Sequence, residues 1–67
     1  MKFDKLRTIR LANNLTQKQL AKKLGYSRTA YSKREIGTQK FDMNDIKILK
    51  KELNLSIEQI DDIFFKD

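Results

Sequence analysis

Residues 27–33, with the sequence SRTAYSK, place hydroxyl and cationic side chains at helical spacing. The planar guanidinium of Arg28 can donate two parallel hydrogen bonds to O6 and N7 of a guanine base. Ser27 stands at the start of this segment, and the N-terminal residues of a recognition helix are those that contact base edges. We therefore expect base contacts from the side chains that face outward here: Ser27, Arg28, Thr29, Ser32 and Lys33.

The charge of the chain is distributed unevenly. The net charge is +6, from 15 Lys and Arg against 9 Asp and Glu. Residues 1–40 carry eleven basic and two acidic residues, which gives +9, whereas residues 41–67 carry −3. A cationic first half favours binding of a polyanion such as nucleic acid. A solvated, lysine-rich surface explains the charge alone equally well.

The side chains that most enzymes use are missing. The chain has no His and no Cys, so it lacks the commonest general base and the usual zinc ligands. Five acidic residues fit helix starts or a polar helix face instead of a catalytic pair: Asp42, Asp45, Glu58, Asp61 and Asp62. We expect no enzyme activity, no cofactor, no metal site and no small-molecule ligand.

Length and hydropathy predict one small soluble domain over residues 1–67. A chain of this size buries only about 60% of the surface that its unfolded form exposes, which leaves little room for a deep cleft. No apolar run approaches the roughly 20 residues that cross a bilayer. The N-terminal MKFDKLR lacks the apolar core of a signal peptide. We expect a soluble cytoplasmic protein that is not associated with a membrane.

Helical periodicity and capping signals predict five short helices, and hence a compact all-α domain. The first covers about residues 3–13, where Phe3, Leu6 and Ile9 share a face, and Asn13-Asn14 marks a turn. The expected N-caps of the other four helices are Thr16, Ser27, Asp42 and Ser56, and capping boxes join Thr16 to Gln19 and Ser56 to Gln59.

Two glycines bracket the third helix, expected over residues 28–35. Gly25 and Gly37 follow the second and third helices, where a positive φ suits glycine. We expect the hydroxyl of Tyr31 to reach the edge of the core. The side chains expected to face inward after the first helix are Leu20, Ala21, Leu24, Ala30, Tyr31, Met43, Ile46, Leu49, Leu53, Ile57, Ile60 and Phe64.

The pattern LxxxRxxxxLTQxxLAxxLGxSxxxYSxxExG, from Leu6 to Gly37, resembles the Cro/C1-type (Xre) helix-turn-helix family of phage repressors and their bacterial relatives. The segment LNLS at residues 53–56 also fits, so the resemblance covers nearly the whole chain. It implies a compact five-helix, lambda-repressor-like fold with the motif at residues 16–37. It further implies a double-stranded DNA partner, a recognition helix in the major groove, and binding of two-fold symmetric operators as a homodimer. It also implies a bacterial protein associated with the nucleoid.

The resemblance also assigns roles to individual residues. Arg10 and Glu35 resemble a partly buried salt bridge that holds the recognition helix. Gln17 resembles a position that bonds a backbone phosphate, which suits a helix N-terminus. The phosphate contacts expected on this basis come from Arg10, Gln17, Lys18, Lys40 and the loop amides near Thr38 and Gln39.

Two regions depart from the family pattern or fall outside it. Arg34 occupies a usually apolar or aromatic position, so it either extends outward with its stem packed or contacts a phosphate. Near the C-terminus, Phe64 and Phe65 point about 100° apart if both are helical. With Phe64 inward, Phe65 either forms an exposed dimer patch beside Ile63 or covers the core.

These features together predict a sequence-specific transcriptional regulator. The hypothesis that we favour is a phage or mobile-element repressor that blocks a promoter, because the sequence ends after the DNA-binding domain. The alternative is an antitoxin that pairs with a toxin and autoregulates its operon. Nothing in the sequence resembles a toxin-wrapping extension.

Overall fold

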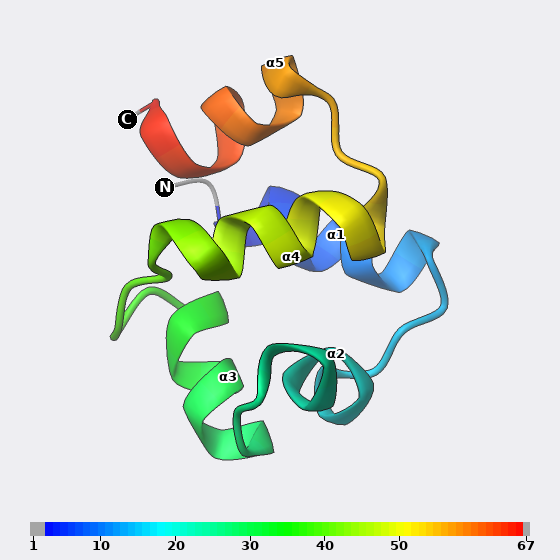
Figure 1. The fold of residues 1–67 in the computed structure, drawn as a ribbon, viewed down its shortest axis with the longest axis vertical. Coiled ribbons are helices and arrows are strands. Elements are labelled where there is room, and N and C mark those ends of the chain that lie inside the picture. Colours follow the sequence, from blue (N-terminus) through cyan, green and yellow to red (C-terminus); the bar gives the residue numbers. More distant parts are fainter. Residues whose placement is uncertain (1–2, 67) are drawn as a thin grey trace.

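The computed structural model describes residues 3–66, without the side chain of Phe3. Every regular element in this range is helical, which confirms the predicted all-α fold. The expected place of Phe3 on the inward face of the first helix lies outside what is described. In chain order the elements are α1 (Phe3–Ala12), α2 (Gln17–Leu24), α3 (Arg28–Glu35), α4 (Met43–Leu53), α5 (Ile57–Ile60) and the π-helical turn η1 (Asp61–Phe65), as Figure 1 shows.

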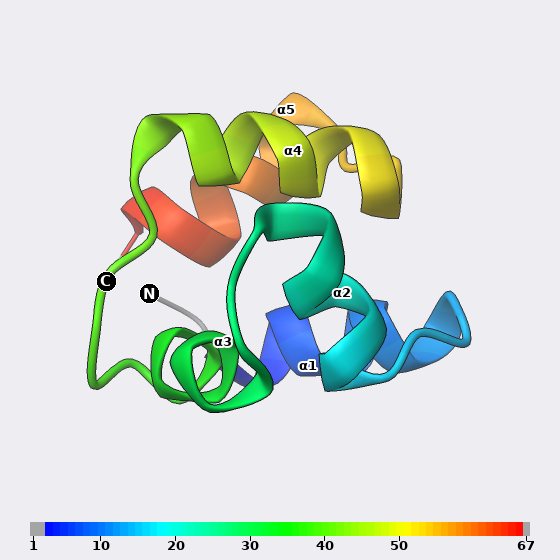
Figure 2. The same ribbon diagram turned by 60° about the horizontal axis from the view of Figure 1, so that its bottom comes forward.

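Helix α4 runs across the middle of the molecule (Figure 1). Helices α2 and α3 lie on one side of it, and α5 with η1 lies on the other. The turned view in Figure 2 shows α4 and α5 together above α1, α2 and α3. Helix α2 packs against α3 and α4, while α1 packs against α3 and η1. The two helices of the motif therefore rest on a scaffold made by the rest of the chain.

One hydrophobic core joins these elements. Most of the side chains that the sequence places inward are buried or packed against it, but Met43 and Ile57 are 60% and 74% exposed, so that expectation is wrong for these two. Each is the first residue of its helix. The Cα–Cβ bond tilts toward the helix N-terminus, so a side chain at this position projects past the packed turn. The core residues are Leu6, Leu20, Ala21, Tyr31, Leu49, Leu53, Leu55 and Ile63.

The helix starts are capped as the sequence predicts. At α2, Thr16 Oγ1 accepts a hydrogen bond from the Gln19 N–H at 3.0 Å, and Gln19 Oε1 accepts from the Thr16 N–H at 2.9 Å. Ser56 and Gln59 form the same capping box at α5. Because each pair satisfies two backbone N–H groups locally, these short helices begin at fixed residues.

Four helices end at a residue with left-handed backbone. After each such residue, the next amide returns to a carbonyl five residues earlier, as in the hydrogen bond of 2.9 Å from the Tyr26 N–H to the Ala21 carbonyl. This ending reverses the chain within a few residues, so α2 passes into α3 through a tight turn. The residues and their φ angles are Asn14 (58°), Gly25 (80°), Gly37 (92°) and Asn54 (53°).

The last helix changes its winding after four residues. The Lys66 N–H donates to the Asp61 carbonyl at 2.9 Å, a bond across five residues that is typical of a π-helical turn. In this turn Ile63 is 1% exposed and belongs to the core, so the expectation that Ile63 contributes to an exposed dimer patch is wrong. Phe65 is 57% exposed and does not cover the core.

Candidate nucleic-acid interface

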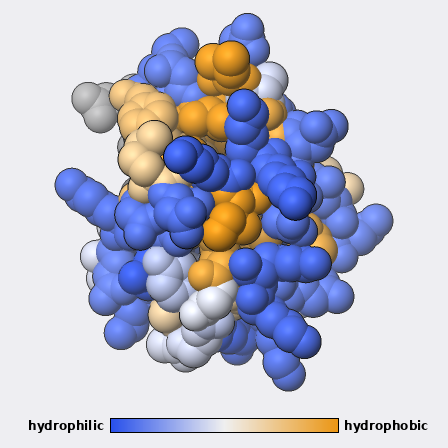
Figure 3. Space-filling view, in the orientation of Figure 1, coloured by the Kyte–Doolittle hydropathy of each residue, from blue (hydrophilic) through white to orange (hydrophobic). Residues whose placement is uncertain are grey.

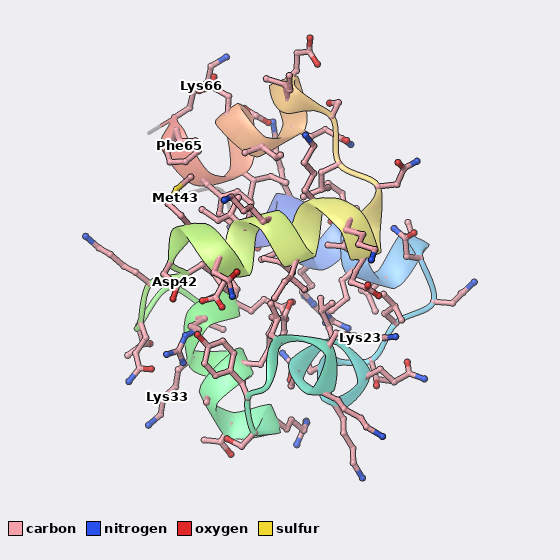
Figure 4. The ribbon with its side chains drawn as sticks, in the orientation of Figure 1. Lys23, Lys33, Asp42, Met43, Phe65 and Lys66 are labelled. Atoms are coloured by element: carbon pink, nitrogen blue, oxygen red, sulfur yellow. The ribbon has the colours of Figure 1, made fainter. Side chains whose placement is uncertain are left out.

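The outward face of α3 carries the side chains expected to read bases. Arg28, Thr29 and Lys33 are exposed, and Lys33 extends away from the helix in Figure 4. Within residues 3–66, no hydrogen bond or ion pair occupies the side chains of these three residues. Ser32 is half-buried. Ser27 is exposed, and its Oγ accepts from the Ala30 N–H at 3.1 Å, which leaves its hydroxyl hydrogen for another acceptor.

A buried ion pair fixes the other end of α3. Glu35 Oε1 accepts from Arg10 Nε at 3.2 Å and from Arg10 Nη2 at 3.1 Å, and the two residues are 3% and 5% exposed. Arg10 Nη1 also donates to the Leu15 carbonyl at 2.8 Å, just before α2. This confirms the predicted salt bridge. It contradicts the predicted phosphate contact of Arg10, because the guanidinium is buried and its donors face protein oxygens.

Tyr31 lies beside this pair and is fully buried. Its hydroxyl oxygen has no hydrogen-bond partner in the described part of the chain, so the expectation that it reaches the edge is wrong. Burial raises the pKa of Tyr31 above its ordinary value, and the nearby Glu35 carboxylate raises it further. The phenol therefore stays neutral against the charged pair.

The start of α2 offers donors that a phosphate can use. Gln17 is half-buried, and its Nε2 donates to Glu35 Oε2 at 3.2 Å. A side-chain amide has two N–H groups, so one remains for a phosphate oxygen. Lys18 and Lys40 are exposed. The phosphate contacts predicted for these three residues stay predictions.

The phosphate contacts predicted for the backbone amides near Thr38 and Gln39 are wrong. The backbone N–H groups of Thr38 and Gln39 both donate to the Lys33 carbonyl, at 2.8 Å and 3.2 Å. These amides close the helix and are not available to a phosphate. Gln39 Oε1 accepts from Arg34 Nη1 at 2.9 Å. Of Thr38 and Gln39, the exposed hydroxyl of the first and the side-chain amide nitrogen of the second can still donate to DNA.

Arg7 is a cationic residue that sequence reasoning missed. It lines a shallow surface hollow of about 710 Å³ at the N-terminus of α2, together with Gln17, Lys18 and Arg28. Because Glu35 neutralises the buried Arg10, the free charge around this hollow comes from Arg7, Lys18 and Arg28. A helix N-terminus surrounded by three cations attracts an anion. The signal in the sequence was the spacing of Arg7 three residues before Arg10 on one helix face.

Arg34 packs against the turn of the motif and does not extend outward, while the phosphate contact expected as the alternative stays a prediction. Its guanidinium carbon lies 4.0 Å from the centre of the Tyr26 ring, and its Nη1 donates to the Ala30 carbonyl at 2.9 Å. Tyr26 Oη in turn donates to Asp45 Oδ2 at 2.7 Å, and Asp45 is 3% exposed on α4. That hydrogen bond is the main cause of a raised Tyr26 pKa. Through these contacts Tyr26, Arg34 and Asp45 join the turn of the motif to α3 and α4.

Within residues 3–66, no helix has the length and apolar composition required to cross a membrane.

Comparisons with known proteins agree with this arrangement. The helix-turn-helix family model HTH_3 matches residues 6–60, which contain the whole motif and most of its scaffold, though not η1. The HTH-type transcriptional activator BcrR of Enterococcus faecalis is 40% identical over 57 residues, covering 85% of this chain and 28% of that protein. This chain therefore spans less than a third of that relative's length. No solved structure matches the chain. The chain belongs to the Cro/C1-type (Xre) family of helix-turn-helix DNA-binding domains.

Proposed function

We propose that this chain regulates transcription by binding a specific double-stranded DNA sequence, with α3 in the major groove. The observation that supports this proposal is the way in which α3 is held and exposed. Its first turn presents exposed Arg28 and Thr29, while its last residue, Glu35, is held by the buried Arg10. A rigid helix with a free, cationic N-terminal turn suits contact with base edges.

We further propose a two-fold symmetric operator that is bound by a homodimer. Successive major grooves on one face of B-DNA lie about 34 Å apart. The domain measures 27 × 23 × 20 Å between its Cα extremes. Two copies on successive grooves therefore come close enough for their side chains to meet, which favours binding as a pair.

We propose that the chain represses transcription. A protein bound to an operator that overlaps a promoter keeps RNA polymerase from binding there. The similar protein from Enterococcus faecalis is named a transcriptional activator. Activation requires an operator placed upstream of the promoter instead. Two reporters distinguish repression from activation: one carries the bound sequence over the promoter, and the other carries it upstream. Transcription from each reporter is compared with and without the protein.

Selection of bound duplexes from a random pool tests the proposal most directly. We expect a single preferred sequence with two inverted half-sites whose centres lie about 10 base pairs apart. The affinity for this sequence should exceed that for a scrambled duplex at every salt concentration. A pool that yields no preferred sequence would show that the chain is a generic cationic binder.

A further inference from the structure

The loop between α3 and α4 is held at its middle by an arginine side chain. Arg34 Nη1 carries two hydrogens, and it donates to Gln39 Oε1 and to the Ala30 carbonyl, both at 2.9 Å. The loop covers residues 36–42 and lies beside the end of α3 in Figure 1. In Figure 3, which has the same orientation, the surface on this flank is mostly hydrophilic. Gln39 is thus attached to α3, although it lies in an irregular, exposed segment.

A cation–π contact holds Arg34 in place. Its guanidinium carbon lies 4.0 Å from the centre of the Tyr26 ring. Tyr26 Oη donates to Asp45 Oδ2 at 2.7 Å, and the same oxygen accepts from the Asp42 N–H at 3.1 Å. Asp45 is buried in the first turn of α4. These contacts run from the start of α4 through the Tyr26 ring to Arg34, so the guanidinium that holds the loop has a fixed position.

Core packing does not explain the placement of Arg34. Its Nε is buried without a hydrogen-bond partner within residues 3–66, and a buried donor without an acceptor lowers the stability of a fold. In the same range Arg34 forms no ion pair, so no carboxylate neutralises its charge. What the side chain provides is a fixed cation next to Gln39.

The chemistry of arginine determines how the Gln39 amide is oriented. A guanidinium has only donors, so the amide oxygen, and not the NH2 group, must face Arg34. Gln39 Nε2 therefore points away from the guanidinium, and within residues 3–66 it has no hydrogen-bond partner. A hydrogen bond from a cation polarises the amide, so its N–H groups become stronger donors. The loop thus presents a fixed, polarised donor.

We propose that Arg34 is a positioning residue, which holds Gln39 so that its side-chain amide donates to a phosphate of the DNA backbone beside α3. The Gln39 N–H donates to the Lys33 carbonyl at 3.2 Å, which places Gln39 next to the exposed face of α3. Phosphate oxygens accept hydrogen bonds from such side-chain amides. The inference rests on the proposed function and adds a residue that acts on DNA only through another.

The first test replaces only the proposed donor. Gln39→Glu keeps an oxygen for Arg34 and substitutes a second oxygen for the NH2 group. The affinity for the selected operator should fall about tenfold or more per half-site, because a donor is lost and a negative charge faces the phosphate.

The matched control for this test is Gln59→Glu. Gln59 is also exposed, and its Oε1 accepts from the Ser56 N–H at 2.8 Å, a bond that a glutamate keeps. The control adds the same charge on α5, on the other side of α4 from α3. It should change the affinity by less than about twofold, because salt screens a distant charge.

A double-mutant cycle tests whether Arg34 acts through Gln39. Arg34→Met keeps an apolar stem against the Tyr26 ring and removes the guanidinium. Its effect on affinity should be larger in the wild-type background than in a Gln39→Ala background, by about twofold or more. The loss of charge is the same in both backgrounds and cancels in the comparison. Equal losses would mean that Arg34 contacts a phosphate itself or only supports the fold, and would overturn the proposal.

Nuclear magnetic resonance of the free protein measures the positioning without DNA. The NH2 resonances of Gln39 should differ from those of a mobile glutamine side chain in the wild type, and should move to the mobile values in Arg34→Met. Arg34→Lys keeps the charge but lacks the planar fork, so it should move these resonances in the same direction. If Arg34→Met does not fold, Arg34→Lys replaces it here and in the cycle. Unchanged resonances would overturn the positioning role.

The outcomes distinguish this inference from the proposed function. If an operator is selected but Gln39→Glu binds it as well as the control Gln59→Glu does, the Gln39 contact is overturned and the proposed function stands. If the random pool yields no preferred sequence, the proposed function fails. The resonances of Gln39 still decide in that case whether Arg34 positions its amide.

Discussion

Arg28 is exposed at the first position of α3 and has no intramolecular ion pair in the described chain. A bidentate contact to guanine contributes about 1–3 kcal/mol of discrimination. Arg28→Ala should therefore weaken binding to the selected operator by about 5- to 150-fold per half-site. Binding to scrambled duplex should fall much less, and preference at one base pair per half-site should relax. Competition titrations measure both affinities.

The matched control for this prediction is Lys22→Ala, which removes an exposed cation from α2 instead of α3. It should lower both affinities equally and slightly. If Arg28→Ala also lowers both affinities by the same factor, Arg28 contacts a phosphate and does not read a base.

The two tyrosines of the motif predict opposite effects of the same substitution. The buried hydroxyl of Tyr31 has no partner, so Tyr31→Phe should raise the free energy of unfolding by about 1 kcal/mol at neutral pH. The Tyr26 hydroxyl donates to the buried Asp45, so Tyr26→Phe should lower it by about 1–3 kcal/mol. Urea unfolding of both variants and the wild type shows whether each substitution raises or lowers the free energy of unfolding. A loss of stability in Tyr31→Phe would mean that an ordered water or the Glu35 carboxylate satisfies the phenol.

Tyr31 also predicts a pH dependence. Burial, and then the charge of Glu35, raise the pKa of Tyr31 in the folded chain. A group whose pKa is higher in the folded state contributes stability below its unfolded pKa, and this contribution is lost as pH rises above it. The wild type should thus lose stability above about pH 10 more steeply than Tyr31→Phe does. Unfolding curves of both proteins at neutral and high pH test this, and parallel losses would contradict it.

At the scale of single elements, the left-handed helix ends decide how α2 turns into α3. Gly25 has φ 80°, and a Cβ built on it meets nothing within 4 Å. Gly25→Ala should therefore cost about 1–2 kcal/mol from backbone strain alone. Gly25→Asn should cost less, because asparagine adopts this conformation at Asn14 and Asn54. Equal losses for Ala and Asn, measured by thermal unfolding, would show that something other than backbone strain requires glycine.

These element boundaries could be predicted from the sequence because their causes are local. The capping boxes at Thr16 and Ser56 join residues three apart, and the left-handed ends depend on one residue each. The ion pair of Arg10 with Glu35 was predicted only through the family pattern, since 25 residues separate the partners.

What sequence periodicity misses depends on tertiary contacts. Arg34 lies over Tyr26 only because a tight turn brings α3 back beside the end of α2. Met43 has the right spacing to face inward but stands one turn too early on α4 to meet a neighbour. Ile63 is buried within the π-helical turn η1, and no local signal in the sequence predicted that change of winding.

At the scale of the whole molecule, the uneven charge along the sequence corresponds to an uneven distribution of charge in space. The helices of the cationic first part, α2 and α3, lie on one side of α4, and α5 with η1 lies on the other. Within residues 3–66, four exposed cations of the first part or of the loop before α4 lie outside the base-reading set and form no ion pair: Arg7, Lys18, Lys22 and Lys40. The cations that a DNA phosphate could contact are thus concentrated in the first part, whereas residues 41–67 carry a net charge of −3.

This asymmetry predicts which lysines govern the salt dependence of binding. Each phosphate neutralised by a cation adds about 0.9 to the negative slope of log affinity against log salt. Lys18→Ala and Lys40→Ala should each reduce the slope by about 1 per protomer, on operator and scrambled duplex alike. Lys47→Ala removes an exposed lysine from α4, outside the motif, and should leave the slope unchanged. Filter-binding titrations from low to moderate salt give the three slopes. If Lys47→Ala lowers the slope as much as Lys40→Ala does, the DNA is held by net charge and not by the face that carries α3.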